Sequence, residues 1–257
     1  MRLGFIGTGI ITQAVVTGLL RSGVSIDPIS LSPRNGEIAA RLAALDGRVQ
    51  VCASNQEVLE TSDVVCLAVI PQIATGVLSE LRFDARHHVI SFIAGIPLDE
   101  VRRLVGSAGS KVVRAIPLPA VAEGKGSTAI CPPDAIAKSL FSALGEAVEV
   151  DDEHKFDALS AVTATMASFF AVLEAQASWL VGQGLDYDAA RSFLSGYCVG
   201  LAHDTTRGGE PFTALIEHCM TPGGINEQVH TELLKRGTYS HFGDALDRVL
   251  TRLEVRV

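Results

Sequence analysis

The 257-residue sequence lacks several features that define large classes of proteins. It has no run of Lys or Arg, and its formal net charge is −8, so we expect it not to bind the backbone of a nucleic acid. Its longest uncharged stretch, residues 158–173, is shorter than the roughly 20 residues that a membrane span requires. We therefore expect no membrane partner and predict a buried helix in this stretch.

Signatures of metal sites and disulfide frameworks are also missing. The five cysteines are scattered, with no C-x-x-C pair, and the seven histidines do not fall at ligand spacing with them. This pattern is typical of reduced, mostly buried thiols in a cytosolic protein, so we predict no metal site and no disulfide. The chain opens directly into an apolar run, from which we expect no signal peptide and a cytoplasmic location.

Short apolar runs alternate with helical segments over the first 150 residues. The runs 64–69, 89–93 and 112–115 are continuously apolar, as strands buried on both faces of a parallel sheet should be. After Asp151 such runs stop, and long segments rich in Ala and Leu follow with helical periodicity. We therefore predict an α/β protein with a Rossmann-type parallel sheet in residues 1–150 and an all-helical domain in residues 151–257.

The first fourteen residues carry the strongest functional signal. Leu3–Ile6 predicts a strand, Gly7-Thr8-Gly9 a tight turn, and the segment from Ile10 a helix. Two such glycines are typical of a dinucleotide-binding turn, because one permits the turn and the next lets backbone approach a pyrophosphate at the helix N-terminus. The third position of that fingerprint, usually glycine, is Thr12 here. A plain structural turn is the alternative.

The loop after the second predicted strand indicates which dinucleotide binds. An acidic residue there favours NAD through the ribose 2′-hydroxyl, whereas Arg accommodates the 2′-phosphate of NADP. No acid occurs here before Glu37, and Ser32, Arg34 and Asn35 can all hydrogen-bond a phosphate. We predict NADP as the cofactor, with NAD as the alternative, and expect Arg34 and Ser32 to contact the 2′-phosphate.

Three further strand ends complete the predicted cofactor crevice, since α/β sheets bind ligands at the carboxyl ends of their strands. They lie at residues 69–72, 91–96 and 114–119. The residues predicted to bind the cofactor are Gly7, Thr8, Gly9, Ile10, Ile11, Ser32, Arg34, Asn35, Val69, Pro71, Gln72, Ala94, Gly95 and Pro117.

One turn of the helical half has the pattern of an anion site. Residues 221–226 read Thr-Pro-Gly-Gly-Ile-Asn. Pro-Gly-Gly ends one helix and presents consecutive N–H groups at the start of the next, an arrangement that binds anions such as a carboxylate. A plain interhelical turn is the alternative.

The helical half is unusually apolar over residues 156–181. About 100 residues make only a modest core, so part of this surface is better explained by burial against a second subunit. We predict a homodimer or a higher assembly of dimers. The core of a small helical bundle is the alternative.

Taken together, the motifs resemble the Δ1-pyrroline-5-carboxylate reductase family. The shared stretches read Gly-Phe-Ile-Gly-Thr-Gly, Ala-Val-x-Pro-Gln, Ser-x-Ile-Ala-Gly-Ile, Arg-Ala-x-Pro and Thr-Pro-Gly-Gly, in this order along the whole chain. The resemblance implies a Rossmann domain, a helical domain that dimerises, an active site between them, and NAD(P)H-dependent reduction of a cyclic imine to proline.

The resemblance also places the substrate at the Pro-Gly-Gly turn. We expect the substrate carboxylate to be held by the backbone there, with Thr221 and Asn226 as side-chain donors in the catalytic role. The predicted substrate-binding residues are Pro222, Gly223, Gly224 and Thr165.

The departures from the family pattern are concentrated at the chemistry. Ile70 stands where the family usually has Lys, and Leu118-Pro119 where it has Asn-Thr. Residues 163–169 replace a Ser-Gly-Ser-Gly-Pro-Ala-Tyr loop, and Ile225-Asn226 replaces Thr-Thr. Reduction of a different cyclic imine or related C=N substrate is therefore a second hypothesis.

The sequence offers no obvious general acid, which favours an imine reductase over an alcohol dehydrogenase. A protonated imine is already electrophilic, whereas alcohol oxidation needs a positioned acid–base group. A β-hydroxyacid-type dehydrogenase would need a catalytic lysine, for which Lys155 and Lys235 are the candidates. A non-catalytic nucleotide-sensing protein is the remaining alternative.

Overall fold

The computed structural model describes residues 1–106 and 111–255, which divide into two compact units. The first comprises Met1–Ser160 together with the C-terminal end of the chain from Leu253, and the second comprises Ala161–Arg252. Residues 256–257, at the end of the predicted helical domain, lie outside the described residues.

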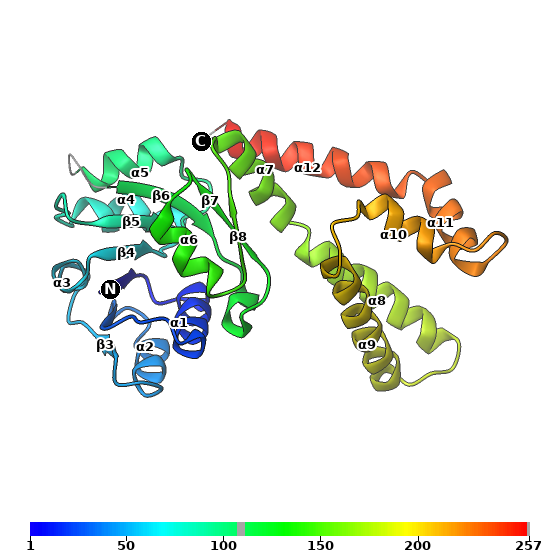
Figure 1. Ribbon diagram of the computed structural model, residues 1–257, viewed down its shortest axis with the longest axis horizontal. Helices are drawn as coiled ribbons and strands as arrows, with labels where there is room; N and C mark the ends of the chain where they lie inside the picture. Colours follow the sequence, from blue (N-terminus) through cyan, green and yellow to red (C-terminus); the bar gives the residue numbers. More distant parts are fainter. Residues whose placement is uncertain (107–110, 256–257) are drawn as a thin grey trace. The chain divides into compact units, whose positions relative to one another are not determined.

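An eight-stranded sheet forms the centre of the first unit (Figure 1). Its strands are β1 (Leu3–Ile6), β2 (Ile29–Leu31), β3 (Val49–Val51), β4 (Val64–Leu67), β5 (His88–Ser91), β6 (Lys111–Ile116), β7 (Ser127–Cys131) and β8 (Glu146–Glu149). The strand order is β3-β2-β1-β4-β5-β6-β7-β8, so the chain changes winding direction between β1 and β4. Doubly wound sheets bind ligands at this switch point.

Helices cover both faces of the sheet. They are α1 (Ile10–Ser22), α2 (Gly36–Ala43), α3 (Asn55–Thr61), α4 (Pro71–Ser79), α5 (Leu98–Val105) and α6 (Ala135–Ser142). Side chains alternate along a strand, so Val64 and Cys66 of β4 join the core with α1, α2 and α6. Val65 and Leu67 join the core with α3, α4 and α5. Burial on both faces explains why β4 reads as an unbroken apolar run.

The Rossmann-type α/β fold with a helical C-terminal half is confirmed, but the last strands differ in direction from the expected parallel sheet. Strands β1 to β6 are parallel to one another, whereas β7 pairs antiparallel with β6, and β8 follows β7. Residues 117–126 between β6 and β7 hold only a short 3₁₀ helix, η1 (Pro119–Glu123). A parallel return needs a crossover of about a dozen residues or more, so this connection reverses the chain.

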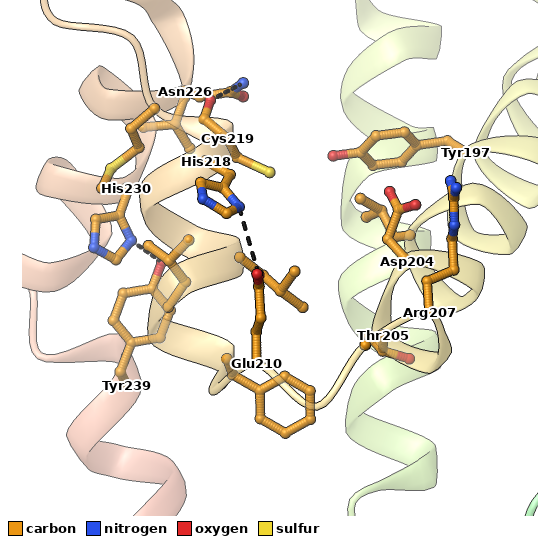
Figure 2. Close-up of a pocket in the computed structure, with 17 residues that line it drawn as sticks. Tyr197, Asp204, Thr205, Arg207, Glu210, His218, Cys219, Asn226, His230 and Tyr239 are labelled. Carbon is orange, nitrogen blue, oxygen red and sulfur yellow. Dashed lines mark hydrogen bonds and ion pairs between the residues drawn. The ribbon is translucent and has the colours of Figure 1, made fainter.

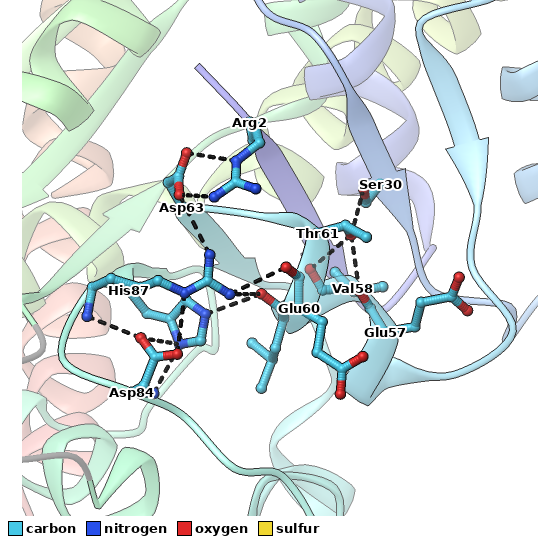
Figure 3. Close-up of polar contacts among 11 residues, drawn as sticks. Arg2, Ser30, Glu57, Val58, Glu60, Thr61, Asp63, Asp84 and His87 are labelled. Atoms are coloured by element: carbon cyan, nitrogen blue, oxygen red, sulfur yellow. Dashed lines mark hydrogen bonds and ion pairs between the residues drawn. The ribbon is translucent and has the colours of Figure 1, made fainter.

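A network of polar contacts joins the amino ends of β1, β4 and β5 (Figure 3). Arg2 forms a two-point ion pair with Asp63, and its hydrogen bonds hold the pKa of Asp63 below the usual value. Arg86 adds a contact of 3.6 Å to Asp63. The buried His87 accepts a backbone hydrogen bond at Nδ1, so its Nε2 donates to the Leu59 carbonyl oxygen at 3.0 Å. These contacts lie at the amino ends of the strands, opposite the carboxyl ends where the crevice is predicted, and they link the strand ends to one another.

A buried ion cluster fastens the start of α7 (Glu153–Thr163) to the sheet. Arg114 of β6 is 3% exposed and donates from Nη1 to Glu153 Oε1 at 2.7 Å and to Asp157 Oδ1 at 3.0 Å. The last strand ends at Glu149, but the first compact unit continues into α7 as far as Ser160.

The second unit is helical and has a small core of its own. It contains the end of α7, then α8 (Met166–Gly182), α9 (Tyr187–Thr206), α10 (Phe212–Cys219), α11 (Ile225–Lys235) and most of α12 (Thr238–Glu254). Its buried hydrophobic cluster consists of Ala177, Ala190 and Leu194, with Leu180 packed against them between α8 and α9. Such a cluster is too small to stabilise so many helices by itself.

The stretch of residues 158–173 is not the buried helix that the sequence predicts. It is divided by a break at residues 164–165, and Val162, Phe169 and Phe170 are 52%, 54% and 65% exposed. Within one chain nothing covers these side chains among the described residues. The apolar pattern predicts that this surface is covered, but it does not identify the molecule that covers it.

Candidate functional site

The turn between β1 and α1 is the centre of the predicted crevice. Gly7 has φ = +102°, and a Cβ there would lie 2.5 Å from the Ala68 carbonyl oxygen, so this position requires glycine. Gly9 is the N-cap of α1, and a Cβ there would meet nothing within 4 Å. Because α1 begins without a side-chain cap, its first N–H groups face the open space beside Gly9 and can bind a phosphate.

Buried hydroxyl groups hold this turn. Thr12 donates from Oγ1 to the Gly7 carbonyl oxygen at 2.6 Å, so the third fingerprint position supports the turn through a hydrogen bond. Ser32 Oγ accepts from the Gly7 N–H at 3.0 Å, and Thr8 Oγ1 donates to the Ser32 carbonyl oxygen at 2.8 Å. The loop after β2 and the glycine turn therefore form one hydrogen-bonded structure.

The loop after β2 holds the three residues predicted to contact a phosphate, of which one is buried and two are exposed. Ser32 is 0% exposed, so its predicted contact with a 2′-phosphate requires the loop to open. Arg34 and Asn35 are exposed, and Arg34 has no ion-pair or hydrogen-bond partner within the described part of the chain. Asn35, at φ = +62°, is the N-cap of α2, and Glu37 follows in the first turn of that helix. Of the three predicted contacts, Arg34 and Asn35 are therefore open to solvent, and Ser32 is not.

The remaining predicted cofactor residues lie along the same sheet edge. Strands β1, β4, β5 and β6 are parallel neighbours, which brings their carboxyl ends together. Exposed residues of this group are Ile10, Pro71, Gln72, Ala94 and Gly95, half-buried ones are Ile11 and Val69, and Pro117 is buried. Pro71 begins α4, whose N-cap Ile70 is 61% exposed.

In the second unit, residues 220–224 join α10 to α11, so the predicted turn of residues 221–226 includes the first two residues of α11. Gly223 has φ = +73°, and a Cβ on Gly224 would lie 2.4 Å from Thr221 Oγ1, so both glycines are required by the turn. The Gly224 N–H donates to the Thr221 carbonyl oxygen at 2.8 Å. Gly224 is the N-cap of α11, which begins without a side-chain cap on its first N–H groups.

Two predicted substrate contacts at this turn already have partners within the chain. Asn226 donates from Nδ2 to the Cys219 carbonyl oxygen at 2.9 Å. The Gly223 N–H donates to Glu227 Oε2 at 2.6 Å. Sequence reasoning missed Glu227, although a Glu three residues after an N-cap is the signal of a capping interaction. Thr165, the N-cap of α8, is half-buried and donates from Oγ1 to the Val162 carbonyl oxygen at 2.8 Å.

A cavity of about 950 Å³ lies beside Asn226 in the second unit, between α9, α10, α11 and α12 (Figure 2). On its walls His218 Nδ1 lies 3.8 Å from Glu210 Oε2. His230 stacks on Tyr239, with 3.2 Å between Nδ1 and the phenol oxygen. Neither pair was predicted. Glu210 lies before α10, and His230 and Tyr239 lie on successive helices, so the contacts depend on the tertiary fold.

Within the described residues, the cysteine thiols and the other side chains that can bind metals do not form a metal site. Cys52, Cys66 and Cys131 are buried, whereas Cys198 is half-buried and Cys219 exposed, and all five are free. Burial raises the pKa of the Cys66 thiol and raises that of Cys131 to about 11, so both are protonated at neutral pH. In residues 1–106 and 111–255, no three His, Cys, Asp or Glu side chains gather to hold a metal ion.

Comparison with known proteins accounts for both halves of the chain. Residues 2–95 match the family described as NADP oxidoreductase, coenzyme F420-dependent, and residues 153–255 match pyrroline-5-carboxylate reductase dimerisation. The fold is similar to that of pyrroline carboxylate reductase from Plasmodium falciparum, determined with NADP bound. The TM-score is 0.84 at 19% identity, covering 100% of this chain and 98% of that one.

Two relatives match over most of their length. Pyrroline-5-carboxylate reductase of Methanosarcina acetivorans is 29% identical over an alignment of 262 positions. The alignment covers 98% of this chain and 96% of that protein. Pyrroline-5-carboxylate reductase of Synechocystis sp. is 31% identical over 236 residues, covering 87% and 86%. With this identity over nearly the whole chain, the resemblance drawn from the motifs is confirmed, and the chain belongs to the pyrroline-5-carboxylate reductase family.

Proposed function

We propose that this protein reduces Δ1-pyrroline-5-carboxylate to proline with NADPH, in the cytoplasm. The observation that carries the proposal is the Gly7 turn in a chain of this family. Its positive φ, its buried hydroxyl supports and the open space at Gly9 suit a pyrophosphate at the start of α1.

The residues of the first unit fit a dinucleotide phosphate. The start of α1 holds the pyrophosphate, and the exposed Arg34 and Asn35 hold the 2′-phosphate of NADP, with NAD as the weaker alternative. When bound, the nicotinamide supplies the hydride. The role of the protein is to fix the cofactor at the carboxyl ends of the neighbouring strands β1 and β4.

The substrate needs to be positioned more than it needs a proton donor. A protonated cyclic imine is electrophilic, so no strong general acid is required. The turn of residues 221–226 would anchor the ring carboxylate through the first N–H groups of α11, with Thr221 and Asn226 beside it. Gly223 and Gly224 place no side chain in the turn, Pro222 precedes them as a further predicted contact, and Thr165 is the predicted contact from α8.

A different cyclic imine is the second candidate, because this chain differs from its family at the substrate. Ile70, an exposed apolar residue, stands in place of the usual Lys, and the amide of Asn226 is bonded to the Cys219 carbonyl oxygen. A β-hydroxyacid-type dehydrogenase is less well supported. Lys155 donates hydrogen bonds to Asp151 and Asp152, which raise the pKa of its ammonium group and make it a poor base. Lys235 is an exposed residue at the end of α11.

An assay of NADPH oxidation tests the proposed function. We expect the absorbance of NADPH to fall with Δ1-pyrroline-5-carboxylate, and more slowly with six-membered cyclic imine carboxylates. Faster turnover of a six-membered imine would favour the second candidate. Turnover of a β-hydroxyacid with NADP⁺ and of no imine would show that the proposal is wrong, and NADPH binding without any turnover would indicate a nucleotide sensor.

Arg34→Ala is expected to weaken NADPH binding and to leave NADH binding nearly unchanged. One charge-assisted contact to phosphate contributes about 1.5–3 kcal/mol, or about 10- to 150-fold in Kd. Fluorescence titration with both cofactors measures the difference. The matched control is Arg41→Ala on α2, where Arg41 bonds to Gln13. Ser32→Ala should weaken both cofactors alike, because its hydroxyl supports the turn. Equal loss of NADPH and NADH in Arg34→Ala would contradict the assignment.

The helical unit is expected to associate with a second copy into a dimer or an assembly of dimers. Large apolar side chains of α8 to α11 are more than 60% exposed in one chain, among them Phe170, Trp179, Phe193 and Phe212. Sedimentation velocity at micromolar concentration should give at least twice the chain mass of 27.1 kDa. Phe170→Asp should shift the protein towards monomer, whereas Leu45→Asp, at an exposed site of the first unit, should not. A monomeric wild-type protein would rule the dimer out.

A further inference from the structure

The protein places one of its own carboxylates on the predicted substrate anchor. Glu227 Oε2 accepts from the Gly223 N–H at 2.6 Å, and both residues are exposed. The carboxylate lies at the start of α11, where the helix dipole attracts negative charge. An anionic ligand that approaches the first N–H groups of α11 therefore meets a carboxylate that already holds the neighbouring Gly223 N–H.

We propose that Glu227 is a specificity-determining residue of the imine site. Its carboxylate competes with the ring carboxylate of the substrate for the turn of residues 221–226. It thereby weakens the binding of ring carboxylates relative to rings that lack this group. The inference rests on the proposed function, which places the imine at this turn.

The charges around the turn support competition. Within residues 1–106 and 111–255, no Lys, Arg or His forms an ion pair with Glu227, so its charge is not neutralised by a partner. Asn226 is neutral, and one of the two N–H donors of its amide is already bonded to the Cys219 carbonyl oxygen. A second carboxylate at the start of α11 meets a like charge, an effect of about fivefold on affinity at a separation of a few ångströms in water.

Helix capping is the competing explanation, and it makes a different prediction. Glu227 is the third residue of α11, the position from which Glu often caps the preceding turn. Loss of a cap alters the stability of the turn and affects charged and neutral ligands alike. Competition affects only ligands that carry a carboxylate.

The experiment compares Glu227→Gln with wild type and with the matched control Glu232→Gln. Glu232 lies on the same helix and pairs with Arg236 at 2.7 Å, away from the turn. Calorimetric titration of the full chain with NADP⁺ uses two unreactive rings, tetrahydrofuran-2-carboxylate and its neutral analogue tetrahydrofurfuryl alcohol. The KM values for Δ1-pyrroline-5-carboxylate and for Δ1-pyrroline, which has no carboxylate, are measured in parallel.

We expect Glu227→Gln to bind tetrahydrofuran-2-carboxylate about fivefold more tightly than wild type, with no change for the neutral ring. The KM for Δ1-pyrroline-5-carboxylate should fall by a similar factor, while that for Δ1-pyrroline and the NADPH affinity stay constant. Glu227→Ala, which also removes the hydrogen-bond acceptor, should strengthen carboxylate binding at least as much.

The proposal is overturned if carboxylate affinity does not rise, if both rings change together, or if Glu232→Gln gives the same gain. The calorimetric result stands apart from catalysis. Without imine turnover in any variant, the proposed function fails, yet a carboxylate-selective gain in Glu227→Gln still supports competition at the turn. Absence of ring binding in every variant overturns it.

Discussion

Gly7→Ala is expected to disrupt the dinucleotide turn and to weaken NADPH binding by at least about a hundredfold, equivalent to about 2.7 kcal/mol. A residue with a side chain at φ = +102° is strained by about 1–3 kcal/mol. The new Cβ would also lie 2.5 Å from the Ala68 carbonyl oxygen, so the end of β4 must move. That movement breaks the hydrogen bonds of Gly7 to Ser32 and Thr12. Fluorescence titration measures the loss.

Two glycine controls separate folding from cofactor contact. Gly9→Ala adds a Cβ that meets nothing within 4 Å, so the unfolding midpoint in urea should fall only slightly, by the cost of alanine at a helix N-cap. It should still weaken NADPH, because the methyl group enters the space proposed for the pyrophosphate. Gly76→Ala, in the interior of α4 with open space around it, should leave NADPH binding unchanged and raise the unfolding midpoint, because alanine favours the helix. If Gly9→Ala bound NADPH like wild type, the phosphates would not lie at the start of α1.

Local patterns explain which parts of the fold could be predicted. The strand Leu3–Ile6 has the predicted bounds, because its apolar run is followed at once by the turn residues Gly7-Thr8-Gly9. The end of α1 also has a local signal, since Gly23 adopts φ = +73°, a conformation typical of a glycine that ends a helix. Ser54 caps α3 by accepting from the N–H of Glu57, again a local signal.

The properties that sequence reasoning missed depend on distant partners. The direction of β7 follows from the short connection after Ile116, whereas strand–helix alternation suggested another parallel strand. Ser32 stays a predicted phosphate contact, but the bond of its hydroxyl to Gly7, 25 residues away, could not be identified from the sequence. The bond from the Asn226 amide to the Cys219 carbonyl oxygen, at the end of α10, was missed for the same reason.

Arg114 is buried, but the sequence motifs did not distinguish it from the residues of the predicted cofactor crevice. An arginine within the apolar strand Lys111–Ile116 is itself a signal, because a buried charge requires a partner of opposite sign. The partners, Glu153 and Asp157, lie on α7 and could not be identified from spacing. Glu153 Oε1 also accepts from the N–H of Leu98, so the cluster connects β6, α5 and α7.

Arg114→Met is expected to reduce the free energy of unfolding of the first unit by about 3–5 kcal/mol, the usual effect of breaking a buried ion pair. The substitution leaves the carboxylates of Glu153 and Asp157 close together without their cation, and it removes the guanidinium stacked 4.4 Å from the Phe156 ring. Urea denaturation followed by far-ultraviolet circular dichroism measures the change. Arg102→Met, at an arginine that is 51% exposed, should leave the midpoint unchanged.

A second variant tests the cause of this loss. Arg114→Met combined with Asp157→Leu removes the cation together with its most buried carboxylate, whose side chain is 6% exposed. Apolar replacement of a whole buried pair is often neutral or stabilising, so the double variant should regain much of the stability lost by Arg114→Met. Glu153, at 23% exposed, stays in contact with water. If the double variant were less stable than Arg114→Met, packing of the side chains and not charge compensation would be the main contribution of Arg114 to the fold.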